Sequence, residues 1–301
     1  PYTVNAQGRG PAWSNSLFED NAEFGYGMHL ANLAVRKGLK SKVEELVATA
    51  SSEEVKAAAN EYLDTFNVGA TNGSATDRLV DALTNDNSDL AKDILTNKDF
   101  LAKKSQWIFG GDGWAYDIGF GGLDHVIASG KDVNILVFDT EVYSNTGGQS
   151  SKSTKVGAVA QFAAGGKDVK KKDLASIAMS YGYVYVAQIS MGADYNQAIK
   201  ALTEAEAYPG PSLVIAYAPC IAHGIKKGMG KSMTEEKLAV ETGYWHNFRF
   251  NPQLENKFSL DSKAPTGDYQ EFLKGEVRYA SLALKDPEKA SRLFEKNEEH
   301  A

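Results

Sequence analysis

The sequence is poor in cysteine, in net positive charge and in long apolar runs. Cys220 is the only cysteine among 301 residues, so no disulfide can form within the chain, and a structural zinc site could not draw its thiolates from this chain alone. The formal net charge of −7 argues against a nucleic-acid-binding surface. No stretch approaches the ~20 apolar residues that span a bilayer. We therefore expect no nucleic acid partner, no membrane span and a cytoplasmic location.

The start of the chain also lacks an initiator methionine, a basic leader and an apolar signal core. It begins Pro1-Tyr2-Thr3-Val4, which predicts no targeting segment. We interpret this beginning as that of a processed chain or an excised piece.

From residue 106 onward, strand-like and helical stretches alternate. Four runs of β-branched or aromatic residues are strand candidates, at residues 106–110, 133–140, 183–190 and 211–218. This alternation predicts a mainly parallel sheet, and the continuous apolar runs of the second and fourth candidates indicate that helices cover both faces. The expected fold class is α/β, with three layers of helix, sheet and helix.

Residues 40–104 differ from this core in composition. They are rich in Ala, Glu, Lys, Asn and Asp, contain no strand candidate, and show helix-start patterns at residues 51–54 and 76–77. We predict one domain over residues 1–242, with a helical insertion at about residues 40–104.

After residue 242, aromatic and polar residues replace the strand pattern. Two short helices are expected near residues 270–284 and 287–297. We predict that residues 243–301 form a C-terminal extension, which packs on the domain or on a neighbouring subunit.

Glycines and a carboxylate follow the first strand candidate, in the sequence Gly-Gly-Asp-Gly at residues 110–113. The next strand candidate ends in a second polar, glycine-rich loop at residues 140–149. In an open parallel sheet, ligands bind beyond the carboxyl ends of adjacent strands, where glycines let backbone amides approach phosphate oxygens. The crevice between these two loops therefore suits a diphosphate.

A protein-bound diphosphate usually needs a hard cation, and Mg²⁺ prefers about six oxygen ligands near 2.1 Å. Asp112 offers a carboxylate, and the second loop adds the hydroxyl of Thr140 and the backbone carbonyl of Val142, on the same side of an extended segment. Gly-Asp-Gly by itself is more often merely a turn. A second loop with Thr and Asn at the next strand end favours the cofactor interpretation.

These loops resemble known motifs. Gly-Asp-Gly followed by an Asn or Thr loop resembles the thiamine diphosphate motif. The longer string at residues 139–154, Asp-Thr-Glu-Val-Tyr-Ser-Asn-Thr-Gly-Gly-Gln-Ser-Ser-Lys-Ser-Thr, closely resembles the pyruvate:ferredoxin oxidoreductase family, as do the strings at residues 8–25 and 157–163. The resemblance extends from the first residues to at least Ser232.

The resemblance implies roles for individual residues. Asp112, Thr140 and the Val142 carbonyl would hold Mg²⁺. Gly111 and Asn145 would lie against the diphosphate, and Asn145 is the candidate catalytic residue.

Phe18 would lie beside the thiamine rings. A buried aromatic residue that staples the first helix is an alternative interpretation of Phe18.

Cys220 follows the fourth strand candidate in a proline-braced segment. A lone cysteine is usually an inert buried thiol. In the family that the chain resembles, this cysteine is the last of four ligands of a [4Fe–4S] cluster close to the thiamine. The other three ligands must come from outside this chain, which suggests a segment of a longer polypeptide.

The resemblance implies oxidative decarboxylation of pyruvate with coenzyme A to acetyl-CoA and CO₂. Thiamine diphosphate carries the carbon chemistry, and electrons pass singly from its hydroxyethyl adduct to the iron–sulfur cluster and on to ferredoxin or flavodoxin. The remaining domains of the same enzyme would supply the carboxylate that activates the cofactor. The full enzyme is expected to be a homodimer.

Three alternatives remain open. A thiamine diphosphate decarboxylase or synthase without iron shares the motif but gives no reason for Cys220. A noncatalytic, Rossmann-like nucleotide binder would ignore thiamine diphosphate, and a purely structural subunit would bind neither ligand.

Two further features suggest no separate site. The five histidines show no metal-ligand spacing. The lysine-rich run at residues 167–173 is interpreted most simply as a solvated face, although such a patch could also meet an acidic ferredoxin or the phosphates of coenzyme A.

Overall fold

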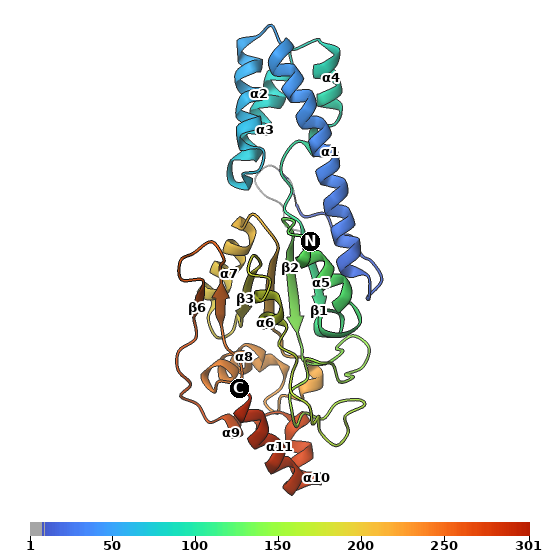
Figure 1. Cartoon of the computed structure of the whole chain (residues 1–301). Helices are drawn as coiled ribbons and strands as arrows, with labels where there is room; N and C mark the ends of the chain where they lie inside the picture. Colours follow the sequence, from blue (N-terminus) through green and yellow to red (C-terminus); the bar gives the residue numbers. More distant parts are fainter. Residues whose placement is uncertain (1–7, 9) are drawn as a thin grey trace. The chain divides into compact units, whose positions relative to one another are not determined.

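A computed structural model describes Gly8 and residues 10–301; residues 1–7 and Arg9, at the start of the predicted domain, lie outside the described residues. The chain divides into two compact units, shown in Figure 1. The sheet unit comprises Pro1–Phe24 and Trp107–Ala301, and the helical unit comprises Gly25–Gln106. In the part of the chain that is described, no helix is long and apolar enough to cross a membrane.

A six-stranded sheet, in the order β1-β2-β4-β3-β5-β6, forms the centre of the sheet unit. Its first four strands are parallel, which confirms the predicted mainly parallel sheet. They are β1 (Trp107–Gly111), β2 (Asn134–Asp139), β3 (Tyr185–Ile189) and β4 (Ser212–Tyr217). Each lies within about one or two residues of the range predicted from its apolar run, as is usual for element ends.

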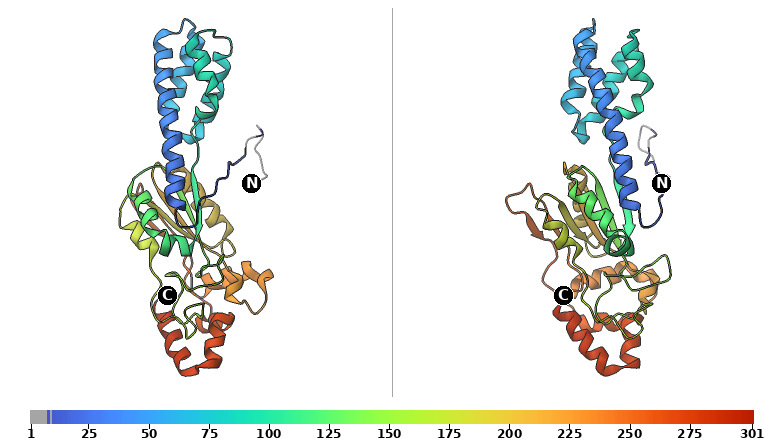
Figure 2. Two further views of the ribbon diagram at one scale, coloured as in Figure 1. Left: turned by 90° about the vertical axis from the view of Figure 1, so that its right-hand side faces the viewer. Right: turned by 45° about the vertical axis from the view of Figure 1, so that its right-hand side comes forward.

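Helices cover both faces of the sheet, as the apolar runs predict. On one face, alanines of α7 (Tyr195–Ala207) pack against Tyr185, Ala187 and Val214. Side chains that alternate with these along the strands are also fully buried, as at Leu213. The left view of Figure 2 shows α7 on one side of the sheet and α5 (Phe120–Ala128) and α6 (Leu174–Met179) on the other.

The C-terminal segment extends the sheet, which was not expected. The antiparallel strands β5 (Phe248–Phe250) and β6 (Phe258–Leu260) add to β3. Strands of three residues have too little alternation to be recognised in a sequence. By its contacts, this segment belongs to the sheet unit and does not form a unit of its own.

The first of the two predicted C-terminal helices is interrupted. Val277 N–H donates to Gly224 O at 2.9 Å, and Glu276 forms a β-bridge with Ile225. These contacts take the backbone out of the helical path after Gly275. The helices here are α8 (Ser232–Glu241), α9 (Tyr269–Lys274), α10 (Val277–Lys285) and α11 (Pro287–Glu299), with 3₁₀ turns η3 (Ile221–His223) and η4 (Met229–Lys231).

Among its described residues, the helical unit consists of helices joined by turns and contains no strand. The helical unit starts at Gly25, whereas the helical insertion was predicted to start at about residue 40. The difference arises because one helix, α1, runs without a break from Asn21 to Thr49. The predicted start at Ser52 is confirmed, since its hydroxyl accepts from Val55 N–H at 3.4 Å. The predicted start at Thr76 is wrong. The elements are α1 (Asn21–Thr49), α2 (Glu53–Thr65), α3 (Gly69–Leu83), α4 (Asp89–Thr96) and η1 (Lys98–Phe100).

Candidate cofactor site

The ends of β1 and β2 bring the two predicted loops together. The strands are parallel neighbours with Gly111 opposite Phe138, so Asp112 and Thr140 follow at the same edge of the sheet. Thr140 Oγ1 lies 2.8 Å from Asp112 Oδ1, and the Thr140 amide donates to the same oxygen at 3.2 Å. The two strand ends therefore form one site.

Three oxygen atoms converge at this point. Thr140 Oγ1 is 2.8 Å from Asp112 Oδ1 and 2.9 Å from the Val142 carbonyl oxygen. A hydroxyl has one proton to donate, so it can bond only one of these acceptors at a time. Neighbouring oxygens around an octahedral Mg²⁺ ion, with bonds near 2.1 Å, are about 3.0 Å apart. The types and spacing of these oxygens fit magnesium, and phosphate and water oxygens would supply its other ligands.

A cavity of about 240 Å³ adjoins these oxygens. Its walls include every residue predicted to bind the thiamine cofactor or magnesium: Phe18, Gly111, Asp112, Thr140, Val142 and Asn145. Pockets that bury a whole drug-sized ligand usually measure about 300–1,000 Å³. The cavity therefore has room for a diphosphate, and a larger cofactor would extend beyond it.

The two glycines beside Asp112 have different roles. A Cβ on Gly113 would lie 2.5 Å from the ring of Tyr143, so this position is glycine because an aromatic side chain packs against it. A Cβ on Gly111 would come no closer than 3.9 Å to any atom, the nearest being Phe138 O. Gly111 thus leaves open space on the cavity wall, where a ligand can approach the backbone.

Alanine at these two positions should separate ligand binding from folding. We expect Gly111→Ala to keep the fold and to weaken cofactor binding about tenfold or more, because its methyl group fills cavity space. Gly113→Ala should displace the Tyr143 ring and destabilise the unit by about 1–3 kcal/mol. Isothermal titration with thiamine diphosphate and thermal unfolding of the protein measure the two effects. If both variants lost the same cofactor affinity and neither lost thermal stability, the different roles given to Gly111 and Gly113 would be contradicted.

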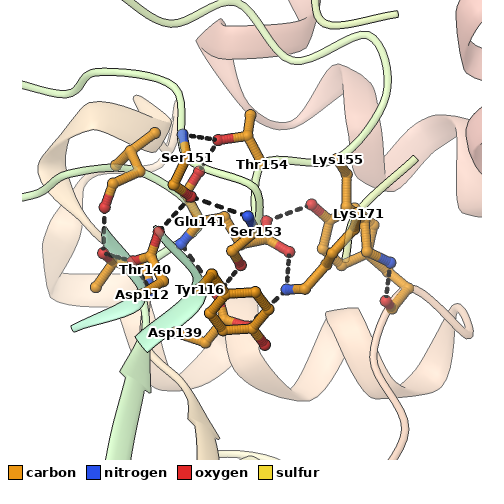
Figure 3. Close-up of polar contacts among 12 residues, drawn as sticks. Asp112, Tyr116, Asp139, Thr140, Glu141, Ser151, Ser153, Thr154, Lys155 and Lys171 are labelled. Carbon is orange, nitrogen blue, oxygen red and sulfur yellow. Dashed lines mark hydrogen bonds and ion pairs between the residues drawn. The ribbon is translucent and has the colours of Figure 1, made fainter. Parts of the chain in front are cut away.

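A serine-rich turn at residues 151–154 fixes the carboxylate of Asp112, as Figure 3 shows. Ser151 Oγ donates to Asp112 Oδ2 at 2.5 Å, and Ser153 N–H donates to Ser151 Oγ at 3.0 Å. The Ser151 amide donates to Thr154 Oγ1 at 2.9 Å. Because both carboxylate oxygens are held, Asp112 presents one orientation to the cavity.

The electrostatics of Asp112 agree with a cation site. Burial raises the pKa of Asp112 to about 7, and the nearby carboxylate of Asp139 adds to this effect. Hydrogen bonds from Ser151 and Thr140 act in the opposite direction. Such a carboxylate is only partly charged at neutral pH, and a divalent cation beside it would favour the charged form.

Two further buried carboxylates, Asp139 and Glu141, share the ammonium group of Lys171 (Figure 3). Lys171 Nζ lies 2.7 Å from Asp139 Oδ2 and 3.2 Å from Glu141 Oε1. Burial by itself would raise the pKa of Glu141. The positive charges of Lys171 and Arg278 outweigh this effect and hold the pKa well below its usual range. Buried charges are tolerated when they are paired in this way.

Glu141 has a φ of +56°, in the left-handed region that non-glycine residues rarely adopt. Its carboxylate accepts from Tyr244 OH at 2.5 Å and lies 2.9 Å from Arg278 Nη2. These partners from the C-terminal segment hold Glu141 in its unfavourable conformation. The Val142 carbonyl follows directly, so the same contacts fix the backbone that presents it.

His223 supports the backbone of Thr140. Its Nε2–H donates to the Thr140 carbonyl oxygen at 2.7 Å, a tautomer assigned because a carbonyl can only accept. His223 is fully buried. Histidine spacing in the sequence gave no sign of this role, because the contact joins residues 83 positions apart.

Cys220 lies after β4 and touches the second loop. Its Sγ is 3.0 Å from Ser144 Oγ, and Ser144 precedes Asn145. Cys220 is 6% exposed and does not line the 240 Å³ cavity. Among the described residues, no group of three His, Cys, Asp or Glu side chains could hold a metal ion. An iron–sulfur cluster at Cys220 would therefore need ligands from other polypeptide.

Phe18 and Asn145 are exposed residues of the cavity wall. The Phe18 side chain is 40% exposed, and its ring centre lies 6.3 Å from that of Tyr143. This exposure does not fit the alternative interpretation of Phe18 as a buried staple. Both side chains are accessible to a ligand.

The interpretation of residues 167–173 as a solvated face is wrong for three of its four lysines. Lys167 donates to a backbone carbonyl of the serine-rich turn at 2.6 Å, and Lys171 joins the two buried carboxylates. Lys172 donates to a backbone carbonyl of the π-helical turn η2 (Gly113–Ile118) at 3.0 Å. Only Lys170 is exposed among these lysines. The other three lysines therefore bind backbone carbonyls and buried carboxylates next to the candidate site.

A larger cavity of about 450 Å³ lies elsewhere in the sheet unit and contains none of the predicted site residues. Lys155, Lys171, Tyr244 and Trp245 are part of its wall. Burial lowers the pKa of Lys155 to about 7, and its ammonium lies 3.8 Å from the centre of the Tyr244 ring. Of the two cavities, the smaller one has the converging oxygens and the open glycine in its wall.

Residues 98–216 match a family model described as the thiamine pyrophosphate enzyme, C-terminal TPP binding domain. Thiamine pyrophosphate is another name for thiamine diphosphate. The matched range contains Gly111, Asp112, Thr140, Val142 and Asn145. Both loops of the candidate site thus fall within the matched domain.

Known proteins are similar over almost the whole chain. A pyruvate-flavodoxin oxidoreductase of Klebsiella pneumoniae is 56% identical over 307 residues, which cover 100% of this chain and 26% of that protein. A pyruvate:ferredoxin oxidoreductase of Moorella thermoacetica is 56% identical over 312 residues, with the same two coverages. A mitochondrial NADP(+) pyruvate dehydrogenase of Euglena gracilis is 48% identical over 300 residues, which cover 97% of this chain and 17% of that protein. The chain therefore spans about a quarter or less of the length of these relatives.

Proposed function

We propose that the 240 Å³ cavity binds the diphosphate of thiamine diphosphate with Mg²⁺. Residues 98–216 match the thiamine pyrophosphate-binding domain, and the whole chain is 56% identical to part of a pyruvate:ferredoxin oxidoreductase and of a pyruvate-flavodoxin oxidoreductase. The observation that carries this proposal is the convergence of three oxygens, from Asp112, Thr140 and Val142, beside that cavity. Asp112 follows β1, whereas Thr140 and Val142 follow β2, so a single isolated turn could not supply all three oxygens.

Each residue of the site has a proposed task. Asp112, Thr140 and the Val142 carbonyl hold Mg²⁺, while Gly111 and Asn145 lie against the diphosphate. Asn145 is the residue that we assign to contact with the reacting atoms, because its side chain is exposed on the cavity wall.

Phe18 covers the thiamine rings, and its exposed position on the cavity wall supports this assignment. When bound, thiamine diphosphate supplies a carbanion that attacks the 2-oxo acid and a ring that accepts the electron pair left by CO₂. The chain orients this group and limits the access of water.

We propose that the full enzyme oxidatively decarboxylates pyruvate with coenzyme A and passes electrons to ferredoxin or flavodoxin. The names of the relatives support the substrate and the electron carriers. Cys220 would be one ligand of a [4Fe–4S] cluster, with three ligands from other domains of the same enzyme. Its contact with Ser144, beside Asn145, supports a place for the cluster close to the cofactor loop. We further propose a cytoplasmic homodimer.

Titration of the intact, longer polypeptide tests the proposed function. We expect thiamine diphosphate to bind tightly with Mg²⁺ and weakly with EDTA, and pyruvate with coenzyme A to release CO₂ while ferredoxin is reduced. Iron analysis should find at least one [4Fe–4S] cluster. Magnesium-dependent nucleotide binding without affinity for thiamine diphosphate would favour a Rossmann-like nucleotide binder. Cofactor binding and turnover without iron would favour a decarboxylase or synthase.

A further inference from the structure

A tight turn at residues 160–163, the Phe162 turn, displays the most exposed large apolar side chain among the described residues. Phe162 is 92% exposed, and its φ of +65° lies in the left-handed region. The Ala163 amide donates to Ala160 O at 2.9 Å and closes the turn. Gly or Asn is usual where a turn needs a positive φ. Phe162 is therefore unfavourable both in its backbone and in its exposure.

Backbone hydrogen bonds join the Phe162 turn to the second loop of the cofactor site. Gln161 N–H donates to Gly148 O at 3.0 Å, and Ser150 N–H donates to Gln161 O at 2.9 Å. Gly148 N–H in turn donates to Tyr143 O at 2.8 Å and closes the second loop. A contact that immobilises Phe162 would therefore also stabilise this loop.

Ile221, a second exposed apolar side chain, lies in a segment that touches the same loop. It is 80% exposed. A Cβ on Gly148 would lie 3.4 Å from the Cβ of Ala222, the next residue along. The segments that carry Phe162 and Ile221 thus both contact Gly148, in the loop that carries Asn145, and we call the two side chains together the Phe162–Ile221 surface.

We propose that the Phe162–Ile221 surface docks onto an apolar surface of another domain of the same longer polypeptide, and that this contact braces the cofactor loop. The inference rests on the proposed function. It adds a specific contact through which other domains control cofactor affinity.

Three observations favour a domain of the same polypeptide as the partner. The relatives are about four times as long as this chain, since it covers 26% of their length. The 240 Å³ cavity beside the loop is smaller than the usual pocket for a whole cofactor, so bound thiamine diphosphate would extend beyond it toward other polypeptide. Phe162 and Ile221 are uncharged, whereas a carrier protein that binds briefly is normally steered by charge.

Variants of the intact enzyme test whether the Phe162 side chain acts. Phe162→Ala should weaken magnesium-dependent binding of thiamine diphosphate about tenfold, and Phe162→Tyr should retain it. Leu284→Ala is the matched control, because it removes an 87% exposed apolar side chain from α10 and should leave binding unchanged. Phe162→Gly relieves the backbone conformation but lacks the ring, so it should lose as much affinity as Phe162→Ala. Wild-type affinity in Phe162→Gly would overturn the inference.

Cross-linking identifies the partner independently of cofactor binding. With Phe162 replaced by p-benzoylphenylalanine in the intact enzyme, we expect cross-links to residues of the same polypeptide outside this segment. Mixing ¹⁴N- and ¹⁵N-labelled protein separates links within one chain from links between copies. Links only between copies, only to added ferredoxin, or to no protein would overturn the proposal. A wild-type enzyme that fails to bind thiamine diphosphate would refute the proposed function, while the cross-link would still decide the docking.

Discussion

Replacing Asp112 by alanine should weaken the magnesium-dependent binding of thiamine diphosphate about 100-fold or more in the intact enzyme. Asp112 supplies the only carboxylate among the three converging oxygens, and hard cations depend on charged oxygen ligands. Loss of a residue that merely orients a metal ligand typically costs about 10- to 100-fold in affinity. Loss of the ligand itself should reach at least the upper end of that range.

A second Asp112 variant, compared with a control at another aspartate, separates the charge of the Asp112 side chain from its shape. Asp112→Asn keeps the size of the side chain and an oxygen for Ser151, yet lacks the charge, so magnesium dependence should fall while the fold is kept. Asp124→Asn is a control in α5, where the carboxylate accepts from Tyr181 OH at 2.7 Å and does not line the cavity. Isothermal titration with Mg²⁺ or EDTA measures the effect. Wild-type affinity in both Asp112 variants would show that the ion is held elsewhere.

Removing the charge of Lys171 should open the structure around the site. Lys171→Met leaves the carboxylates of Asp139 and Glu141, both fully buried, without their shared cation. Removal of one partner from a buried ion pair typically costs about 3–5 kcal/mol. Amide hydrogen exchange around Glu141, measured by mass spectrometry, should accelerate roughly 100-fold or more.

Lys170→Met provides the matched control for this prediction. Lys170 is the adjacent lysine, and its side chain is exposed. Its replacement should change exchange little, because exposed charges contribute little to stability. Equal exchange rates in the two variants would show that Lys171 does not hold the buried carboxylates.

Much of the core and of the candidate site follows from local sequence. The parallel strands were predictable because each is a short apolar run bounded by polar loops. Asp112 and Thr140 were predictable as neighbours because both follow the carboxyl ends of strands, where parallel chains place their loops together. These inferences needed only the order of elements along the chain.

The supporting residues were not predictable in the same way. Lys171 lies in a run whose letters are typical of a solvent-exposed face, and only the tertiary position of Asp139 and Glu141 makes it a buried partner. Ser151 stood within the string used for the family resemblance, but its hydrogen bond to Asp112 depends on the path of the intervening loop. His223 likewise acts on a distant backbone atom.

Errors at element ends have physical causes as well. Thr76 followed by Asp77 has the letters of a helix start, yet α3 begins earlier, at Gly69, and buries Thr76 within its length. The strands β5 and β6 are held by pairing with β3, which no local pattern reveals. Tertiary contacts therefore override local preference at these places.

The contacts of Glu141 also bear on how the protein is made. Tyr244 lies 103 residues after Glu141, and Arg278 lies further still. A ribosome adds about 5–20 residues per second. Tyr244 and Arg278 are therefore translated several seconds after Glu141, which has neither partner until then. The four parallel strands β1 to β4 can assemble earlier, because all of them precede residue 244. The finished conformation of Glu141 and of the Val142 carbonyl beside it is thus a late product of synthesis, and a nascent chain halted before residue 244 would lack it.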